Sequence, residues 1–148
     1  MNRSDQIDYV SEQLPSAAGL LARLLVRQLG GELSRTALGL LNTLSGGPRR
    51  ITELAELEGL AQPTMTSLVK QLEQRGLVRR DRQTDDGRVV LVHLTDGGAV
   101  ALDDFRARAR ELLGSYLAEI PDQQVQALAA ATDALAQLVA LLQQPPSA

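Results

Sequence analysis

The sequence predicts a mainly α-helical protein with one small β-hairpin, on the evidence of three features of its 148 residues. Leucines, valines and alanines recur every three or four positions over most of the chain, a spacing that lines one face of a helix. Between residues 77 and 94 this spacing gives way to two short runs around Asp85-Asp86-Gly87, which is typical turn chemistry. One Phe, two Tyr and no Trp leave an aliphatic core, which suits packed helices better than an aromatic-rich β-sandwich.

The first 31 residues are expected to form two consecutive helices. A short helix over residues 5–14 should end at Pro15, because proline lacks an amide hydrogen and crowds the preceding helical turn. A second helix starts at Ser16, and its leucines recur every three or four positions until the pair Gly30-Gly31. This helix therefore has one long apolar face.

Two shorter helices are predicted next, each bounded by a cap and a break. The first has Ser34 as its N-cap and stops at the Gly-Gly-Pro run of residues 46–48. The second has Thr52 as its N-cap, buries Leu57 among other residues, and ends at Gly59.

A third short helix opens at Gln62-Pro63, since proline is tolerated in a first turn, and ends at Gly76. Its periodicity separates an apolar stripe from a polar face. The predicted inward stripe consists of Met65, Leu68, Val69 and Leu72.

The hairpin and two long helices complete the predicted order of elements. Residues 77–81 and 88–94 read as strands, the second being mostly Val and Leu. Thr95 is expected to cap a helix of more than 20 residues, and Pro121 to begin a final helix that ends near Gln144.

The composition excludes several classes of site. Without cysteine the chain has no disulfide and no thiolate metal site, and a single histidine is too little for most zinc sites. That residue, His93, alternates with Val92 and Leu94, which favours a packing or hydrogen-bonded role. There is no phosphate-cradling glycine loop and no paired nucleophile and base, so we expect no enzyme, no metal and no cofactor.

The N-terminus has no apolar signal region, and no stretch approaches 18 apolar residues. We therefore expect a soluble, cytoplasmic protein without a membrane partner.

Charge is distributed unevenly along a chain whose net charge is −3. Residues 49–95 carry eight basic and seven acidic side chains, whereas residues 96–148 carry three basic and seven acidic ones. Four arginines at positions 75, 79, 80 and 82 stand close together with only Asp81 among them. Such a local basic patch can bind phosphate even on an acidic protein, because screening confines the field to its surroundings.

Three helices followed by a hairpin are typical of a winged helix-turn-helix. The long helices at the two chain ends have more apolar surface than so small a lobe can cover. Large exposed apolar faces usually mark interfaces, so a symmetric dimer built from the chain ends is expected. The predicted division is a DNA-binding lobe over residues 33–95 and dimerisation helices over 1–32 and 96–148.

Two segments carry a resemblance to a known family: LAELEGLAQPTMTSLVKQLEQRGLVRR and DDGRVVLVHLT. With them the chain resembles the MarR (multiple antibiotic resistance regulator) family of bacterial transcription factors, from about Leu33 to Thr95 in residues and over nearly its full length in element order. The resemblance implies a homodimer that binds pseudo-palindromic double-stranded DNA, commonly as a repressor, and often releases it on binding a small ligand.

The chain departs from the family pattern at two positions. Gly87 stands where the family usually has the first of two arginines at the tip of the hairpin, or wing. The wing is therefore expected to bind phosphate less tightly. Ala61 stands where the family commonly has a serine cap, which costs the following helix about 1 kcal/mol, partly offset by Thr64.

The resemblance places the helix from Gln62 to Arg75 in the major groove, as the second helix of such motifs. A glutamine amide can pair with adenine, and a threonine methyl can touch a thymine methyl. The candidate major-groove contacts are Gln62, Pro63, Thr64, Thr66, Ser67, Lys70 and Gln71.

A second group of candidates belongs to the hairpin and its approaches. Arg88 matches the family's second wing arginine and suits the negative potential of a narrow minor groove, with Asp85 or Asp86 holding it in place. The remaining candidates are phosphate contacts or, alternatively, solvated surface charges: Arg49, Arg50, Arg79, Arg80 and Arg82.

A second function remains open, namely a winged helix that binds proteins and has little affinity for DNA. The acidic net charge and Gly87 favour this alternative. The effector site stays unassigned, because Tyr9, Phe105 and Tyr116 suit core or dimer contacts as well as the wall of a ligand cavity.

Overall fold

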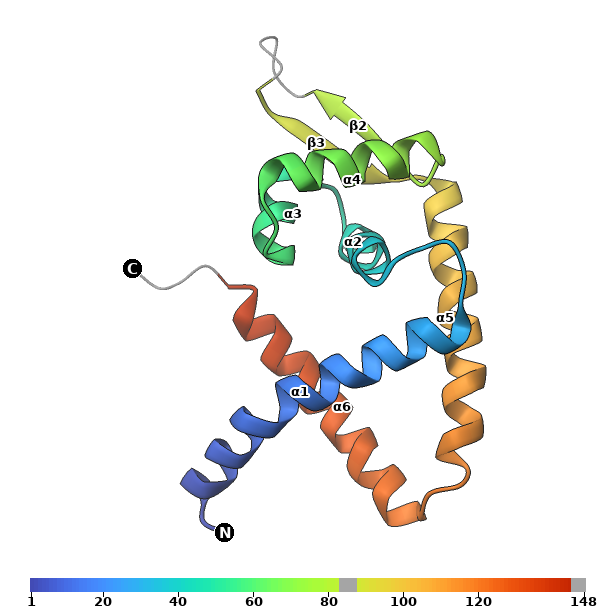
Figure 1. The fold of residues 1–148 in the computed structure, drawn as a ribbon. Helices are drawn as coiled ribbons and strands as arrows, with labels where there is room; N and C mark the ends of the chain where they lie inside the picture. Colours follow the sequence, from blue (N-terminus) through green and yellow to red (C-terminus); the bar gives the residue numbers. More distant parts are fainter. Residues whose placement is uncertain (83–87, 145–148) are drawn as a thin grey trace. The chain divides into compact units, whose positions relative to one another are not determined.

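The computed structural model describes residues 1–82 and 88–144, which form six helices and three strands in this part of the chain (Figure 1). Their order is α1 (Arg3–Leu29), α2 (Arg35–Ser45), β1 (Arg49–Arg50), α3 (Ile51–Glu58), α4 (Gln62–Gln74), β2 (Val78–Arg82), β3 (Val90–Leu94), α5 (Asp96–Leu117) and α6 (Asp122–Leu142). They divide into two compact units, Met1–Ala109 and Arg110–Ala148, and each is described by itself. A mainly helical protein with a small antiparallel sheet is confirmed.

The prediction of a helix break at Pro15 was wrong, because α1 runs without interruption through that residue. A proline inside a helix removes one hydrogen bond and costs about 3 kcal/mol, which a 27-residue helix can absorb through its remaining bonds. The start of α1 is fixed by a capping box, in which Asn2 Oδ1 accepts from the Asp5 amide at 2.9 Å and Asp5 Oδ2 accepts from the Asn2 amide at 3.2 Å.

The core of the first unit lies between α2, α3, α4 and the sheet. Ser34 caps α2 as predicted, its hydroxyl accepting from the Ala37 amide at 3.1 Å. Most of the predicted inward stripe of α4 is buried, and Leu68 packs partly buried against it. The largest fully buried side chains are Leu40, Leu41, Leu54, Met65, Leu72, Val69, Val78 and Val92.

Two expectations for α3 were wrong. Thr52 is not its cap, because the helix begins at Ile51 and the residue before it, Arg50, donates its amide to the Glu53 carboxylate at 3.2 Å. Leu57 is 50% exposed, because the short helix turns only Ile51, Leu54 and Ala55 towards the core.

The sheet has three strands in the order β1-β3-β2, so the hairpin has a third strand, β1, that was not predicted from the sequence. Arg49 pairs with Val92 and Arg50 with Leu91, both antiparallel. Two residues are too few for any periodicity, and the pairing is therefore visible only in the tertiary structure. The second hairpin strand is also shorter than predicted, since β3 starts at Val90.

A tight junction joins α5 to the turn that follows α4. Thr95 caps α5 as predicted: its Oγ1 accepts from the Gly98 amide at 3.0 Å and donates to the Gly76 carbonyl oxygen at 2.5 Å. The Thr95 amide donates to the Leu77 carbonyl oxygen at 3.2 Å. Gly98 is buried against the same carbonyl, and a Cβ there would overlap the Leu77 oxygen.

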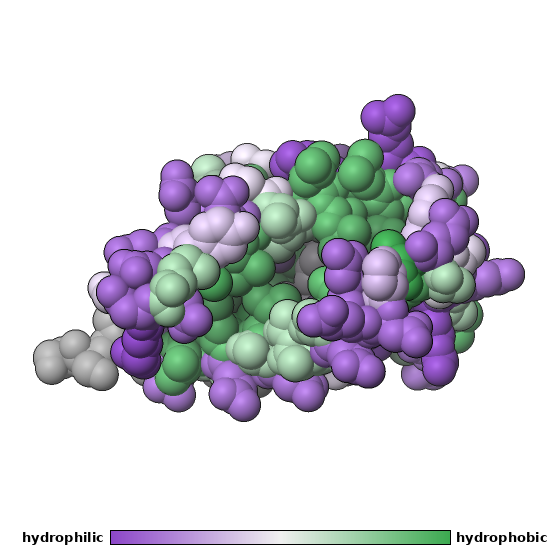
Figure 2. Space-filling model, turned by 90° about the horizontal axis from the view of Figure 1, so that it is seen from below, coloured by the Kyte–Doolittle hydropathy of each residue, from purple (hydrophilic) through white to green (hydrophobic). Residues whose placement is uncertain are grey.

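Two helices have no buried residue in the described part of the chain, namely α1 and α6. Large hydrophobic areas are visible on the surface viewed in Figure 2. By length and composition alone α6 is apolar enough to cross a membrane, contrary to the expectation that the chain has no such stretch. Asp133 stands near the centre of that helix, and an aspartate there opposes membrane insertion by about 2.5–3.5 kcal/mol.

The Gly98 junction yields a stability prediction. Gly98→Ala forces backbone against backbone and should destabilise the first unit by about 1–3 kcal/mol, measured as a lower urea midpoint. Gly19→Ala, in α1 of the same unit, is the matched control, because its added Cβ meets only the flexible end of the Arg23 side chain, at 3.7 Å. That control should keep or raise stability through helix propensity. Equal effects of the two substitutions would contradict the close packing at Gly98.

Candidate nucleic-acid interface

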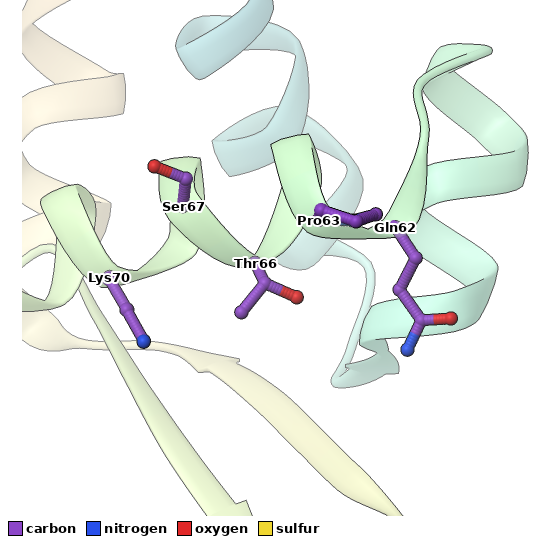
Figure 3. A pocket seen from close by; sticks show the side chains of 5 residues that line it. All are labelled: Gln62, Pro63, Thr66, Ser67 and Lys70. Atoms are coloured by element: carbon purple, nitrogen blue, oxygen red, sulfur yellow. The ribbon is translucent and has the colours of Figure 1, made fainter.

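A groove of about 540 Å³ separates the polar side of α4 from the hairpin. Gln62, Thr66 and Lys70 line it from α4 and point to the same side of that helix (Figure 3). The other wall is basic and consists in part of Arg50, Arg80, Arg82 and Arg88. The fold thus brings predicted major-groove residues and predicted wing and phosphate residues to one groove.

A second, shallower hollow of about 480 Å³ lies along the outer face of α4. Pro63 and Ser67 line it together with the three residues already named, and Ser67 points away from their side (Figure 3). Thr64 and Gln71 are exposed on the same helix but do not line either hollow. All seven candidates are at least partly accessible, and their contact with bases stays a prediction.

The N-terminus of α4 has no side-chain cap in the described structure. Ala61 occupies the cap position in an extended conformation, as expected from the sequence, and Pro63 lies in the first turn. The first amide groups of α4 consequently have no side-chain acceptor and point their partial positive charge outwards. Water or a phosphate oxygen can accept from them.

Part of the predicted wing lies outside the described residues. Asp85 and Asp86 belong to the segment 83–87, so their role in holding Arg88 stays a prediction. Arg88 itself is exposed at the edge of that segment and lines the groove.

The five predicted phosphate residues occupy different environments. Arg49 donates from Nη1 to the Pro48 carbonyl oxygen at 3.2 Å. The Arg79 side chain is 60% exposed, and its Nη1 lies 4.0 Å from Asp81 Oδ2. An exposed ion pair at this distance contributes little to stability. Arg50 and Arg82 are exposed and line the groove.

Arg80 is the exception, because Glu73 holds it. The Glu73 carboxylate accepts from the Arg80 amide at 2.9 Å and from its Nε at 3.0 Å, and Nη2 lies 2.9 Å from Oε1. These hydrogen bonds lower the pKa of Glu73 below its usual range. The pair joins the last turn of α4 to β2 and so fixes one wall of the groove against the other.

Sequence reasoning missed Glu73 because it looked for positive charge. The sequence feature that could have predicted the pair is the position of Glu73, seven residues before Arg80 and on the same side of α4 as Thr66 and Lys70. His93, expected to be a packing or hydrogen-bonded residue, is part of β3, and its side chain is 23% exposed. Its buried Nε2 has no hydrogen-bond partner among the described residues and lies 3.9 Å from Asp81.

The Glu73–Arg80 pair gives a pH-dependent stability prediction. Because the folded-state pKa of Glu73 is lowered, its contribution is complete at neutral pH and disappears as the pH falls through that folded pKa. Glu73→Gln should cost about 1 kcal/mol or less at pH 7, since the pair is partly exposed, and nothing at about pH 2. Urea unfolding at several pH values measures the difference.

Glu56→Gln is the matched control for that series, because Glu56 is exposed on α3 in the same unit. A constant effect of Glu73→Gln at every pH would show that the lost contribution is not the ionised carboxylate.

Comparisons with known proteins agree with this geometry. The MarR family model matches residues 33–90. The HTH-type transcriptional repressor MdtR of Bacillus subtilis is 29% identical over 91 residues, which are 62% of this chain and 59% of that protein. The chain thus matches only about three fifths of the length of this relative.

Two further comparisons extend over most of the chain. The HTH-type transcriptional regulator MT0903.1 of Mycobacterium tuberculosis is 31% identical over 133 residues, which are 86% of this chain and 93% of that protein. The crystal structure of a probable transcriptional regulator from Pseudomonas aeruginosa has 30% identity and a TM-score of 0.60, covering 90% of this chain and 99% of the other. With these matches, and with a winged helix in place, the chain belongs to the MarR family of transcriptional regulators.

Proposed function

We propose that this protein is a dimeric, sequence-specific DNA-binding repressor that a small-molecule effector releases from its operator. The observation that carries the proposal is the groove of about 540 Å³, in which the polar side of α4 faces four arginines. That combination offers base-reading groups and phosphate-binding groups on one accessible surface.

In this proposal α4 enters the major groove. Its accessible side chains include an amide at Gln62, hydroxyls at Thr66 and Ser67, and an ammonium group at Lys70. These are the groups that pair with base edges, and a threonine methyl also fits beside a thymine methyl. The uncapped first turn of α4 adds amide donors for a backbone phosphate.

The hairpin supplies the second contact. Arg88 would lie in the adjacent minor groove, where narrow A·T-rich sequence concentrates negative potential. Arg50 and Arg82 would contact the flanking phosphates, whereas the bonds to Glu73 make Arg80 mainly a support for the hairpin.

Exposed apolar faces support a dimer. Leu20, Leu21 and Leu24 on α1 are 39–52% exposed, and Leu141 and Leu142 on α6 are 63% and 77% exposed. A second copy of the chain would remove these surfaces from water and account for the apolar character of α6 without a membrane. We assign dimerisation to residues 1–32 and 96–148, and DNA binding to residues 33–95.

Repression and effector release rest on relatives. MdtR is named as a repressor. The structure of NadR, 22% identical with a TM-score of 0.59, was determined in complex with 4-hydroxyphenylacetate. Because a regulator of this kind acts where its DNA is, the proposal includes a cytoplasmic location.

Selection of bound sequences from a random double-stranded DNA pool tests the DNA-binding proposal. A pseudo-palindrome with half-sites about one helical turn apart is expected, because a two-fold dimer presents two copies of α4. A pool without enrichment at low salt would refute the proposal and leave a winged helix that binds proteins.

Substitutions in the groove separate the two kinds of contact. Arg88→Ala should weaken binding to many sequences by about 1–3 kcal/mol. The slope of the logarithm of the binding constant against the logarithm of the salt concentration should become shallower by about one. Ser67→Ala should instead change the preferred base at one position of each half-site. Arg35→Gln, an exposed arginine outside the groove, is the control. Fluorescence anisotropy with the selected operator measures all three, and unchanged affinity for Arg88→Ala and Ser67→Ala would refute the assigned interface.

The proposed dimer predicts a particle of twice 15.9 kDa by light scattering. Placing two aspartates on α1, with Leu21→Asp and Leu24→Asp, should produce monomers and reduce operator affinity together, because each chain then binds one half-site alone. Leu57→Asp is the control, since Leu57 on α3 is exposed to a similar extent. A monomeric wild-type protein that still binds the full operator tightly would contradict the dimer.

A further inference from the structure

The groove between α4 and the hairpin contains a basic residue that the protein itself neutralises. Arg50, Arg82 and Lys70 line the groove, and among the described residues no carboxylate lies within ion-pair distance of their charged groups. Arg80 lines the same groove, but its Nη2 lies 2.9 Å from Glu73 Oε1. The fold therefore brings Arg80 to the place of a phosphate contact and occupies its charge there.

Glu73 binds Arg80 through both carboxylate oxygens. Oε1 accepts from Nε at 3.0 Å, and Oε2 accepts from the Arg80 amide at 2.9 Å. The Arg80 and Glu73 side chains are 31% and 34% exposed, so the pair lies at the groove surface, within reach of a DNA phosphate. A phosphate presents the same kind of bidentate acceptor to a guanidinium as a carboxylate does. Glu73 and DNA therefore compete for one guanidinium.

Release of Arg80 would affect two kinds of DNA binding differently. Phosphate contacts carry no sequence information, so an additional free cation strengthens binding to DNA of any sequence. Binding to an operator also requires α4 and the hairpin to reach bases together, and the bonds of Glu73 to Arg80 connect these two elements. Breaking the pair thus favours sequence-independent binding more than operator binding.

We propose that Glu73 is a specificity-determining residue, which keeps the Arg80 guanidinium away from phosphates and so limits binding to DNA of random sequence. The inference rests on the DNA binding proposed above and deepens it. The exposed cations of the groove, Arg50, Arg82 and Lys70 among them, then supply the sequence-independent part of the affinity, while Arg80 orients the hairpin.

Two other carboxylates of the first unit provide matched comparisons. Glu32 Oε2 lies 2.9 Å from Arg75 Nη2, but Arg75 is not among the described residues that line the groove. Glu53 Oε1 accepts from the Arg50 amide at 3.2 Å, a bond to the backbone of a residue that lines the groove. Neutralising Glu32 frees an arginine elsewhere, whereas neutralising Glu53 removes a negative charge beside the groove without freeing a guanidinium.

Competition between the selected operator and a random-sequence duplex of the same length, followed by fluorescence anisotropy with the full chain, tests the inference. Glu73→Gln keeps an oxygen that can accept from the Arg80 amide and removes the charge that holds the guanidinium. Because the pair is partly exposed, its loss leaves the variant folded.

Glu73→Gln should raise affinity for the random duplex about tenfold, because one more charge-assisted bond to phosphate becomes available. The slope of the logarithm of that binding constant against the logarithm of the salt concentration should become steeper by about one. Operator affinity should rise by at most about threefold, because the link between α4 and the hairpin is weakened at the same time. The ratio of operator affinity to random-duplex affinity should therefore fall about threefold or more.

A double variant, Glu73→Gln with Arg80→Gln, identifies the cause. Removal of the freed guanidinium should return the random-duplex affinity and its salt dependence to about the wild-type values. Glu32→Gln and Glu53→Gln should each leave the random-duplex affinity within about twofold of the wild type, because neither frees a guanidinium in the groove.

Three results would overturn the inference: an unchanged random-duplex affinity for Glu73→Gln, an equal gain for operator and random duplex, or an equal gain after Glu53→Gln. A purely structural role for the pair would weaken operator binding and leave the salt dependence of the random duplex unchanged. If the wild type binds its selected operator, each of these results leaves the proposed function standing. If the wild type binds no DNA, the proposed function itself fails.

Discussion

The contact between the start of α5 and the turn after α4 fixes α4, the hairpin and the start of α5 relative to one another. Thr95 bonds to the carbonyl oxygens of Gly76 and Leu77 and at the same time caps α5 through the Gly98 amide. Gly76 has a φ of 75°, which lets the chain turn sharply from α4 into β2 within this contact. One junction therefore orients α4, the hairpin and α5 together. The Glu73–Arg80 pair ties the last turn of α4 to β2 across the same turn.

The charge of the groove depends on pairing more than on the number of arginines. Glu73 neutralises Arg80 within the protein, whereas Arg50 and Arg82 stand exposed in the groove wall. An acidic chain with a net charge of −3 can in this way present a local positive surface. Surfaces of this kind bind phosphate by releasing counterions, so we expect the proposed DNA binding to depend strongly on salt.

The parts predicted correctly from the sequence are those determined by neighbouring residues. Ser34 and Thr95 cap their helices because a hydroxyl reaches an amide three positions on, and this spacing is visible in the sequence. The errors have tertiary causes. Leu57 is exposed because α3 is too short to cover it, and α1 continues through Pro15 because a long helix tolerates one lost bond.

The groove itself was predictable only in part. The polar face of α4 follows from its periodicity and the basic hairpin from composition, but the pairing of Glu73 with Arg80 joins two elements across a turn. The link from Arg75 to Glu32 spans 43 positions and has no local signature. Strand β1 was not predicted for the same reason: both of its residues pair with β3, which is distant in the sequence.

The strand order has a consequence for solubility. With β3 in the centre, both edges of the sheet belong to arginine-bearing strands, the two-residue β1 and the longer β2. Exposed edges are templates on which other chains can add strands, and natural proteins protect them with short strands and positive charge. Exposed Arg50, Arg79 and Arg82 place charge along both edges, a pattern that opposes intermolecular strand addition. Replacing them together, as a test of the proposed phosphate contacts, would also remove that charge from the sheet edges.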